Sequence, residues 1–585
     1  MKTWGKYIKP YKLYFILGPL CMIVEVIGEV LMPRMYSLIV KKAEMQLTAD
    51  TGSIWYVVAM AAVMIFIAIL MMLGGIGGAY FGAKASVNFG SDLRLDVYKK
   101  VQKFSFANID KFQTGSLITR LTNDVTQLQN FVNMLLRMFL RTPGMLIGAL
   151  IMTVTISPKL SLVLAIAIPI LAILLTVVMK VGFPRFGAMQ GKVDALNNTV
   201  GENLTNMRVV KSFVREDFEE EKFETANAEL RNSAMNAMNV MILTQPIMML
   251  VMNLTTLAVI WFGGNMVFGK ELAYSDFNAL LTYINQILMS LMMVTMLFMN
   301  SSRAAASAKR IKEVLKEEPD INDDNAAHKD TFVKSGEIIF NNVSFRYYKN
   351  SPDCVLEDIN FKIRAGETLG IIGGTGSGKS TLVSLIPRLY DTDSGEVLID
   401  GINVRDYSLY ALRESIGMVL QKNLLFSGTV EENLRWGDEE ATIDEMKAAA
   451  KIAQADSFIK NFTDGYAHEI ERGGTNVSGG QKQRLCIARA LIKKPKILIL
   501  DDSTSAVDTA TEAKIREAFA TTLKDSTKII IAQRISSVID ADRILVLDDG
   551  KIVGLGTHDE LMGYCDAYKE IYTLQMENKE VAANG

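Results

Sequence analysis

The segment Ile371-Ile372-Gly373-Gly374-Thr375-Gly376-Ser377-Gly378-Lys379-Ser380 joins a short apolar strand pattern to a helical run over residues 381–389. Residues 373–380 match the pattern GxxxxGK[ST] between a strand and a helix, the context that a phosphate-binding loop requires. The glycines let backbone N–H groups turn inward around phosphates, and the helix N-terminus adds partial positive charge. In this pattern Lys379 reaches the β- and γ-phosphates and Ser380 binds Mg²⁺. The segment therefore predicts an α/β P-loop NTPase domain.

A second pattern, Lys496-Ile497-Leu498-Ile499-Leu500-Asp501, describes a buried strand that ends in a carboxylate. Asp501 suits the Mg²⁺ ligand that P-loop NTPases place at this point. A strand-end cap would explain an isolated pattern of this kind equally well. The phosphate-binding loop in the same chain favours the metal ligand.

The residues before about 310 are of a different kind. The chain has 585 residues, of which 49% are hydrophobic, and six stretches reach the roughly 20 helical residues that cross a bilayer. Two of these stretches carry charges, which are Glu25, Glu29 and Arg34 in the first and Arg137 and Arg141 in the third. The six predicted spans are residues 13–40, 54–73, 132–156, 160–179, 240–267 and 277–299.

The connections between these spans have unequal lengths. Residues 41–53, 157–159 and 269–276 are short, whereas residues 83–130 and 180–237 are long, charged and helical in pattern. The bias of Lys and Arg places the N-terminus and both long connections in the cytoplasm. We therefore expect a multi-pass α-helical transmembrane domain over residues 1–310, a polar linker over 311–335 and the nucleotide-binding domain over 336–585.

The overall charge excludes one class of function. Lys and Arg number 62 against 64 Asp and Glu, a net charge of −2, so the chain lacks the basic excess of a nucleic-acid-binding protein. The four cysteines are scattered and indicate neither a zinc site nor a disulfide framework.

The segment Asn476-Val477-Ser478-Gly479-Gly480-Gln481 precedes the strand that ends at Asp501. Together with the phosphate-binding loop and the six spans, it makes the whole chain resemble the ATP-binding cassette (ABC) family. The resemblance implies a half-transporter of exporter type: a six-span domain with the type IV exporter fold, followed by one nucleotide-binding domain. ATP and Mg²⁺ are then the expected cofactors.

The same resemblance assigns roles by position. Tyr347 would stack on adenine, Gln421 would sense the γ-phosphate and Mg²⁺, and Ser505-Ala506-Val507-Asp508 would form the D-loop. Ser478-Gly479-Gly480-Gln481 looks like the signature motif, which contacts ATP held on the opposite nucleotide-binding domain. The expected nucleotide-binding residues are Tyr347, Gly373, Gly374, Thr375, Gly376, Ser377, Gly378, Lys379, Ser380, Thr381, Gln421, Ser478, Gly479, Gly480, Gln481 and Asp508, and the expected Mg²⁺ ligands are Ser380, Gln421 and Asp501.

The expected catalytic residues are Gln421, Asp502 and Gln533, and the last two depart from the family pattern. Asp502 stands where a competent member has Glu, and a carboxylate misplaced by about 1 Å can cost on the order of 10²-fold in rate. Gln533 stands at the switch position in place of His, and none of the three histidines, His328, His468 and His558, can substitute. The sequence therefore predicts a site that binds ATP well and hydrolyses it slowly.

The chain combines an intact signature motif with an ATP site that lacks the usual catalytic residues. This combination indicates a heterodimer. The partner would be a homologous ABC half-transporter with its own Glu and His, whose hydrolytic site this chain completes. The chain resembles the degenerate-site subunit of bacterial heterodimeric multidrug exporters. A third departure, Arg472 in place of an expected acidic residue, would alter contact with the coupling helices.

Two further sets of residues are candidates for coupling and transport. Residues 113–120 and 208–216 look like the two coupling helices, with solvated helix surface as the alternative. Glu25 and Glu29 are spaced i,i+4 on the first span and would line a pathway for cationic cargo. The alternatives are pairing with a basic residue of the partner or burial against a polar neighbour. Gln286, Met289 and Met293 on the last span offer an adaptable cavity surface, with lipid-facing or core packing as the alternative.

The resulting expectation is ATP-driven export of small amphipathic or drug-like molecules across a bacterial cell membrane by alternating access. A lipid or peptide exporter is the alternative within the same class. An ATP-gated regulatory or channel-like membrane protein is the alternative of a different class, against which the signature motif and Gln421 argue.

Overall fold

The computed structural model describes residues 2–49, 54–324, 326–348, 352–503 and 506–584. The chain forms two compact units. The first, here called the helical unit, contains the residues up to Gln102 together with Gly115–Lys316. The second, here called the α/β unit, contains Lys103–Thr114 and the residues from Glu317 onward. A short segment from within the helical half of the sequence therefore belongs to the α/β unit.

Long helices make up the helical unit. Across the described residues, six helical segments are long and apolar enough to cross a membrane, in agreement with the six predicted spans. The main helices are α2 (Lys12–Ala49), α3 (Ile54–Gln102), α6 (Val125–Met138), α7 (Arg141–Ile156), α8 (Pro158–Thr205), α10 (Glu216–Phe268) and α11 (Tyr274–Lys316). Shorter helical pieces are α1 (Lys2–Ile8), η1 (Lys9–Tyr11), α5 (Thr114–Thr119), η2 (Arg120–Asp124) and α9 (Met207–Ser212).

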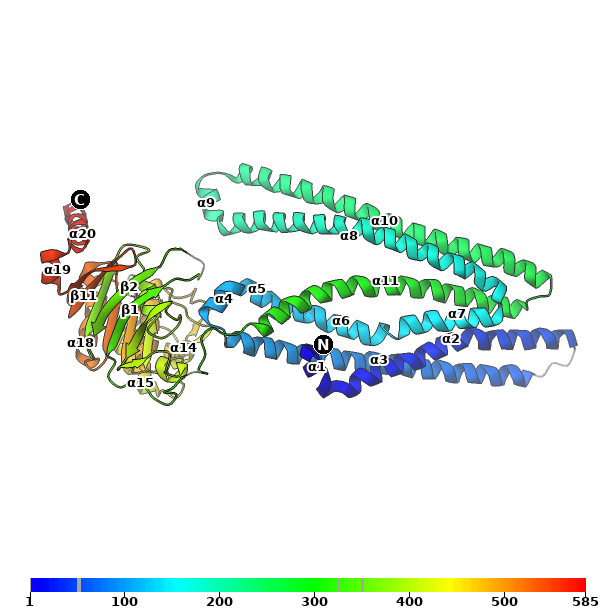
Figure 1. Cartoon of the computed structure of the whole chain (residues 1–585), viewed down its shortest axis with the longest axis horizontal. Helices are drawn as coiled ribbons and strands as arrows, with labels where there is room; N and C mark the ends of the chain where they lie inside the picture. Colours follow the sequence, from blue (N-terminus) through cyan, green and yellow to red (C-terminus); the bar gives the residue numbers. More distant parts are fainter. Residues whose placement is uncertain (1, 50–53, 325, 349–351, 504–505, 585) are drawn as a thin grey trace. The chain divides into compact units, whose positions relative to one another are not determined.

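The long charged connections are largely helical, as predicted, and in large part they continue the membrane helices. Helix α3 continues from its apolar part to Gln102, and α8 and α10 form a long antiparallel pair joined through α9 (Figure 1). Helices α7 and α8 meet in a tight hairpin because Ser157 caps the N-terminus of α8 and Pro158 occupies its first turn, where a missing N–H costs nothing.

The core of the helical unit lies around the last helix. Tyr283, Ile284 and Ile287 of α11 are fully buried among apolar residues of α7, α8 and α10. The Tyr283 hydroxyl donates to the backbone carbonyl of Val30 on α2 at 2.7 Å. Large apolar side chains elsewhere on these helices point outward, among them Trp261, which is 71% exposed, as expected for helices solvated by lipid.

The α/β unit is built on two main sheets. The strands are β1 (Ile338–Phe345), β2 (Leu356–Ile363), β3 (Thr368–Gly373), β4 (Ser394–Ile399), β5 (Ile402–Asn403), β6 (Ile416–Val419), β7 (Gly428–Thr429), β8 (Glu469–Ile470), β9 (Ile497–Asp501), β10 (Thr527–Ile531), β11 (Arg543–Asp548) and β12 (Lys551–Gly556). Strands β2-β1-β4-β5 form an antiparallel sheet, and β12-β11-β3-β10-β9-β6 form a sheet that is parallel except for β12. Strands β7 and β8 pair separately.

The helices of this unit are short. They are α4 (Phe106–Phe112), α12 (Lys379–Ser384), α13 (Leu409–Glu414), α14 (Val430–Arg435), α15 (Ile443–Ile452), α16 (Asp456–Ile459), α17 (Gly479–Ile492), α18 (Thr509–Thr522), α19 (His558–Tyr564) and α20 (Asp566–Asn584), with single turns η3 (Gly465–Ala467) and η4 (Ile535–Ser537). One apolar cluster lies between the two sheets, and a second joins α14, α15 and α17 to β9.

The register of the parallel sheet decides where the site lies. Strand β10 pairs with β3 on one side and with β9 on the other, so that Ile531 lies opposite both Ile371 and Asp501. Strand β6 continues the sheet beyond β9. Because parallel strands end at the same edge, the segments that follow β3, β6, β9 and β10 meet there. These segments carry the phosphate-binding loop, Gln421, Asp501 and Gln533.

Candidate nucleotide-binding site

The phosphate-binding loop leaves β3 so close to the neighbouring strand that only glycine fits at its first position. A Cβ atom on Gly373 would lie 2.0 Å from the carbonyl oxygen of Leu547 on the neighbouring strand β11. On Gly374 or Gly376, by contrast, a Cβ atom would meet nothing within 4 Å. The loop is therefore pressed against the sheet on one side and open on the other, which fits the close approach of a phosphate chain to its backbone.

Lys379 lies inside this loop. Its Nζ donates to the carbonyl oxygens of Gly373 and Gly374 at 3.0 and 2.6 Å and to Ser377 Oγ at 3.3 Å. Burial lowers the pKa of the Lys379 ammonium, and the negative charges of Asp501 and Asp502 oppose that shift. A cation held at this position, facing two carboxylates, matches the lysine that P-loop NTPases use to bind phosphate oxygens.

Asp501 and Ser380 fit a divalent cation. Asp501 is 4% exposed, and burial raises the pKa of its carboxyl, while a hydrogen bond with Ser380 and the charge of Lys379 lower it. A carboxylate and a hydroxyl in direct contact are hard oxygen ligands, which Mg²⁺ prefers. When bound, Mg²⁺ would be held by Ser380 and Asp501, and it would neutralise charge on the phosphate oxygens.

The two residues that depart from the family pattern bind each other. Gln533 Nε2 donates to Asp502 Oδ2 at 2.9 Å. Burial raises the pKa of the Asp502 carboxyl. The charge of Lys379 and the hydrogen bond from Gln533 lower it and offset part of this rise. Asp502 has a φ of +47°, a conformation that short polar side chains tolerate better than most. The carboxylate expected to activate water is therefore tied to a neutral amide.

The three histidines lie in other contacts. The backbone N–H of His328 donates to the carbonyl of Asp406, and His468 stacks on Phe462 with ring centroids 4.0 Å apart. His558 begins α19, and its Nδ1 lies 2.8 Å from the Tyr568 hydroxyl. These contacts agree with the prediction that no histidine occupies the switch position.

Tyr347 lies beside the helix that follows the phosphate-binding loop. Its hydroxyl lies 2.9 Å from Thr381 Oγ1, and the residue is 44% exposed, so that part of the ring is accessible. The ring of Tyr390 packs edge-on against Tyr347 with centroids 5.2 Å apart. Tyr390 was not among the predicted site residues, and its position after the loop helix carries no motif.

Tyr390 also holds helix α4. Its hydroxyl donates to Asp110 Oδ2 at 3.2 Å, and its ring packs against Phe106 with centroids 6.0 Å apart. Lys111 adds an ion pair with Glu317 at 2.8 Å. Residues 113–120, the predicted first coupling helix, follow α4 and contain α5. Helix α4 begins after Ser105, which caps its N-terminus, and ends at Phe112, where Gln113 has a φ of +58°. The residues from Gly115 onward belong to the helical unit.

The signature motif forms the N-terminus of α17. Ser478 Oγ accepts the backbone N–H of Gln481 at 3.2 Å, and Gln481 Oε1 accepts the backbone N–H of Ser478 at 2.9 Å, which completes a capping box. A Cβ atom on Gly480 would lie 2.9 Å from the carbonyl oxygen of Ala506, so glycine allows this helix to touch the D-loop. The motif therefore presents a well-ordered helix N-terminus, which suits phosphate binding.

The remaining predicted nucleotide contacts lie in loops. Gln421 follows β6 with an exposed side chain, and Asp508 caps α18 by accepting the backbone N–H of Thr511 at 2.9 Å. The backbone N–H of Ala506 donates to Gln483 Oε1 of α17 at 3.0 Å. Ser505, the first residue of the predicted D-loop motif, lies outside the described residues.

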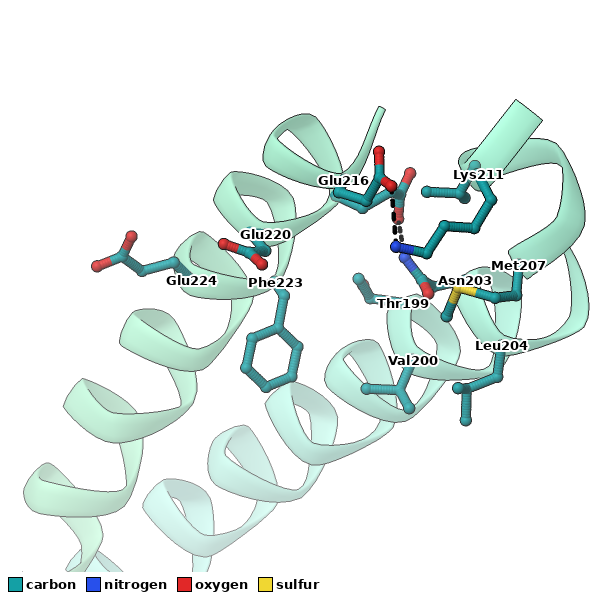
Figure 2. A pocket seen from close by; sticks show the side chains of 12 residues that line it. Thr199, Val200, Asn203, Leu204, Met207, Lys211, Glu216, Glu220, Phe223 and Glu224 are labelled. Atoms are coloured by element: carbon teal, nitrogen blue, oxygen red, sulfur yellow. Dashed lines mark hydrogen bonds and ion pairs between the residues drawn. The ribbon is translucent and has the colours of Figure 1, made fainter. Parts of the chain in front are cut away.

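The second predicted coupling segment, residues 208–216, contains most of α9. This helix closes the tip of the α8–α10 pair, where a cavity of about 650 Å³ lies between the helices (Figure 2). Lys211 Nζ and Glu216 Oε1 form an ion pair at 2.8 Å across its rim. Phe213 and Val214 are 72% and 80% exposed, so the tip carries an uncovered apolar surface.

The membrane carboxylates pair with an arginine of the same chain. Arg141 Nη2 lies 2.7 Å from Glu29 Oε1 and 3.2 Å from Glu25 Oε1, and Gln286 Nε2 donates to the Glu29 carbonyl at 3.2 Å. The basic residue that pairs with Glu25 and Glu29 thus comes from α7 of the same chain. A cavity of about 340 Å³ beside this group is lined by Met22, Asn130, Asn133, Met134, Arg137, Met138 and Arg141. Met289 and Met293 are 52% and 38% exposed.

Comparisons with known proteins agree with this architecture. The family described as ABC transporter transmembrane region matches residues 15–291, and the family described as ABC transporter matches residues 356–505. An uncharacterized ABC transporter ATP-binding protein of Bacillus subtilis, YfiB, is 39% identical over 569 residues, with 97% of each chain covered. The putative multidrug export ATP-binding/permease protein YgaD of the same species is 34% identical, with 99% of this chain and 100% of that protein covered.

A solved structure gives the same result for the fold. The chain superposes on a bacterial Atm1-family ABC exporter with ATP bound at a TM-score of 0.77, with 26% sequence identity and 98% of both chains covered.

We expect Lys379→Ala to lower the affinity of the full chain for ATP by about tenfold to a hundredfold, because it removes charge-assisted hydrogen bonds to phosphate. Titration with a fluorescent ATP analogue measures the change. Lys514→Ala, which removes an exposed lysine of α18, is the control and should leave the affinity unchanged. Equal affinities in the Lys379→Ala variant and the wild type would contradict the assigned site.

We expect Tyr390→Ala to loosen α4, since it removes both the hydrogen bond to Asp110 and the ring contact with Phe106. Amide hydrogen exchange across residues 106–112 should become about two- to tenfold faster, with a smaller effect for Tyr390→Phe, which keeps the ring. Tyr410→Ala, at a 70% exposed position, is the control. Unchanged exchange in α4 would show that Tyr390 does not hold it.

Proposed function

The chain belongs to the ABC transporter family as an exporter half-transporter, and we propose that it works in a heterodimer as the subunit whose own ATP site hydrolyses slowly. It is a multi-pass membrane protein with an ATP-binding domain of the ABC class. The observation that carries the proposal is the hydrogen bond between Asp502 and Gln533, the two residues that depart from the catalytic pattern.

This hydrogen bond bears on the rate in two ways. A carboxylate oxygen that already accepts an amide N–H at 2.9 Å is a poorer acceptor for a proton from water. Gln533 also cannot become a cation, so it offers the γ-phosphate a neutral donor only. Positioned acid–base groups typically contribute about 10²–10⁴-fold, which is the order of loss that we expect at this site.

The parts of the chain that serve a partner are intact. The signature motif keeps its capping box and its contact with the D-loop, so α17 presents backbone N–H groups at its N-terminus. In an ABC dimer this motif contacts the ATP of the opposite domain. This chain would therefore hold one slowly hydrolysed ATP with Lys379 and Asp501 and complete the faster site of its partner.

Each unit also has an apolar surface that a second half-transporter would cover. In the helical unit it is the tip around α9, where Phe213, Val214 and Phe218 are exposed. In the α/β unit, Phe426 and Trp436 stack with centroids 4.1 Å apart and are 48% and 65% exposed, with Leu424 60% exposed nearby. Uncovered aromatic and aliphatic groups of this kind mark interaction sites.

Transport would follow from closure of two nucleotide-binding domains. Helix α4 would transmit that movement to the spans, because Tyr390 and Lys111 fasten it to the α/β unit. The Lys and Arg bias of the sequence supports a cytoplasmic N-terminus and a cytoplasmic α/β unit in a bacterial cell membrane.

Amphipathic cationic compounds are the cargo that we propose. Two carboxylates, Glu25 and Glu29, share the guanidinium of Arg141, which leaves one excess negative charge in this group of three side chains. Among the described residues, Oε2 of each carboxylate has no hydrogen-bond partner. The name of YgaD, a putative multidrug exporter, supports the same class of cargo.

We expect the wild-type chain, purified alone, to hydrolyse ATP slowly. The double variant Asp502→Glu with Gln533→His should raise the rate by at least about tenfold, since it restores a positioned base and an ionisable switch residue. Steady-state phosphate release measures both. Adding Lys379→Ala to the double variant should abolish the gain. If the wild-type chain hydrolysed ATP rapidly and Lys379→Ala removed that activity, the proposal that its own site is slow would be contradicted.

We expect an asymmetry in the complex with a competent partner. Ser478→Ala in this chain should strongly reduce hydrolysis by the complex, because it removes the N-cap of the motif that completes the partner's site. The Asp502→Asn change should leave most of the hydrolysis intact, since the site of this chain contributes little. The reverse pattern of effects would show that this chain carries the faster site.

A further inference from the structure

Helix α20 contacts residues 533–537, here called the switch loop because Gln533 stands at the switch position. Gln575 Nε2 donates to the carbonyl oxygen of Gln533 at 2.8 Å, and Gln575 Oε1 accepts the backbone N–H of Ile535 at 2.9 Å. One side-chain amide therefore makes the pair of bonds that a neighbouring strand would make. It fixes the backbone on both sides of Arg534.

We propose that Gln575 is a positioning residue of the ATP site, which holds the switch loop so that Gln533 stays on Asp502. The inference rests on the proposed function, in which this site binds ATP. Gln575 itself touches no residue of the phosphate-binding loop in the hydrogen bonds described above; it acts through the backbone of Gln533.

Helix α20, which carries Gln575, packs against the rest of the α/β unit. Tyr568 of α20 is fully buried and lies in one apolar cluster with Leu561 of α19 and with Ile535 of the switch loop. The hydroxyl of Tyr568 lies 2.8 Å from His558 Nδ1. The same cluster thus fixes α20 and one end of the switch loop, and Gln575 adds the polar contact next to it.

The other end of the loop depends on this contact. The side chain of Gln533 is exposed to solvent, yet its Nε2 lies 2.9 Å from Asp502 Oδ2. An exposed amide keeps one orientation only when its backbone is fixed, and the carbonyl of Gln533 is bound by Gln575. Precise placement of a group near the γ-phosphate is worth more than its mere presence. Release of α20 from the unit would therefore also loosen the ATP site.

The test compares Gln575→Ala with the wild type in the full-length purified chain. Amide exchange at residues 533–537 should become about tenfold faster, because two hydrogen bonds are lost. Affinity for ATP should fall by about three- to tenfold while affinity for ADP is unchanged, because the proposed role of Gln533 is to donate to the γ-phosphate, which ADP lacks. Thr573→Ala, on the same helix with a hydroxyl that donates to the Lys569 carbonyl within α20, is the matched control.

Two further variants separate positioning from general destabilisation. Gln575→Glu keeps an acceptor for Ile535 but loses the donor to Gln533, so it should reproduce the loss of ATP affinity with a smaller rise in exchange at Ile535. A chain ending at residue 574 should behave as Gln575→Ala does.

Equal losses of ATP and ADP affinity, or no change in either measurement, would overturn the role of Gln575. A wild-type chain that binds neither nucleotide would instead overturn the proposed function, and faster exchange in Gln575→Ala would still support the contact with the switch loop.

Discussion

The parallel pairing of β10 with both β3 and β9 is the constraint on which the ATP site depends. This pairing brings three loops to one edge of the sheet, so that one buried ammonium, Lys379, faces the carboxyls of Asp501 and Asp502. Burial disfavours the charged form of each of these groups, and their mutual attraction offsets part of that cost. If one strand shifted its register, Lys379 would be separated from Asp501 and Asp502, and each charge would be buried without its opposite.

Two elements outside this edge are joined to it by polar contacts. Tyr347, beside the phosphate-binding loop, packs on Tyr390, which binds α4 through Asp110. Gln533, on Asp502, is held by the amide of Gln575 on α20. The first contact joins Tyr347 to a segment from the transmembrane half of the sequence. The second joins Gln533 to helix α20. The nucleotide site is thus connected at both of its ends to elements that can transmit or restrict movement.

In the helical unit, partly buried carboxylates are paired with arginines on neighbouring helices. Arg141 lies between Glu25 and Glu29, and Arg34 of α2 pairs with Asp276 of α11 at 2.6 Å. An uncompensated charge at membrane depth is costly, so these pairs hold α2 against α7 and α11, although Oε2 of Glu25 and of Glu29 is buried without a hydrogen-bond partner among the described residues. The negative excess belongs to a group that is also structural. A cargo that binds there would meet a site already shaped by an arginine.

The sequence by itself determined the six spans, the phosphate-binding loop, Asp501 and the signature motif. Each depends on a contiguous pattern: an apolar run, glycines at fixed offsets, or a carboxylate at a strand end. It also showed that Asp502 and Gln533 depart from the family, although not that they bind each other. Only the tertiary structure decided which short helix docks on the α/β unit, which arginine compensates Glu25 and Glu29, and which side chains hold the switch loop. Tyr390 and Asp110 are 280 residues apart, and Gln575 and Gln533 are 42 apart. Contacts at such separations leave no periodicity in the chain, because they are fixed by packing of whole elements and not by local backbone preference.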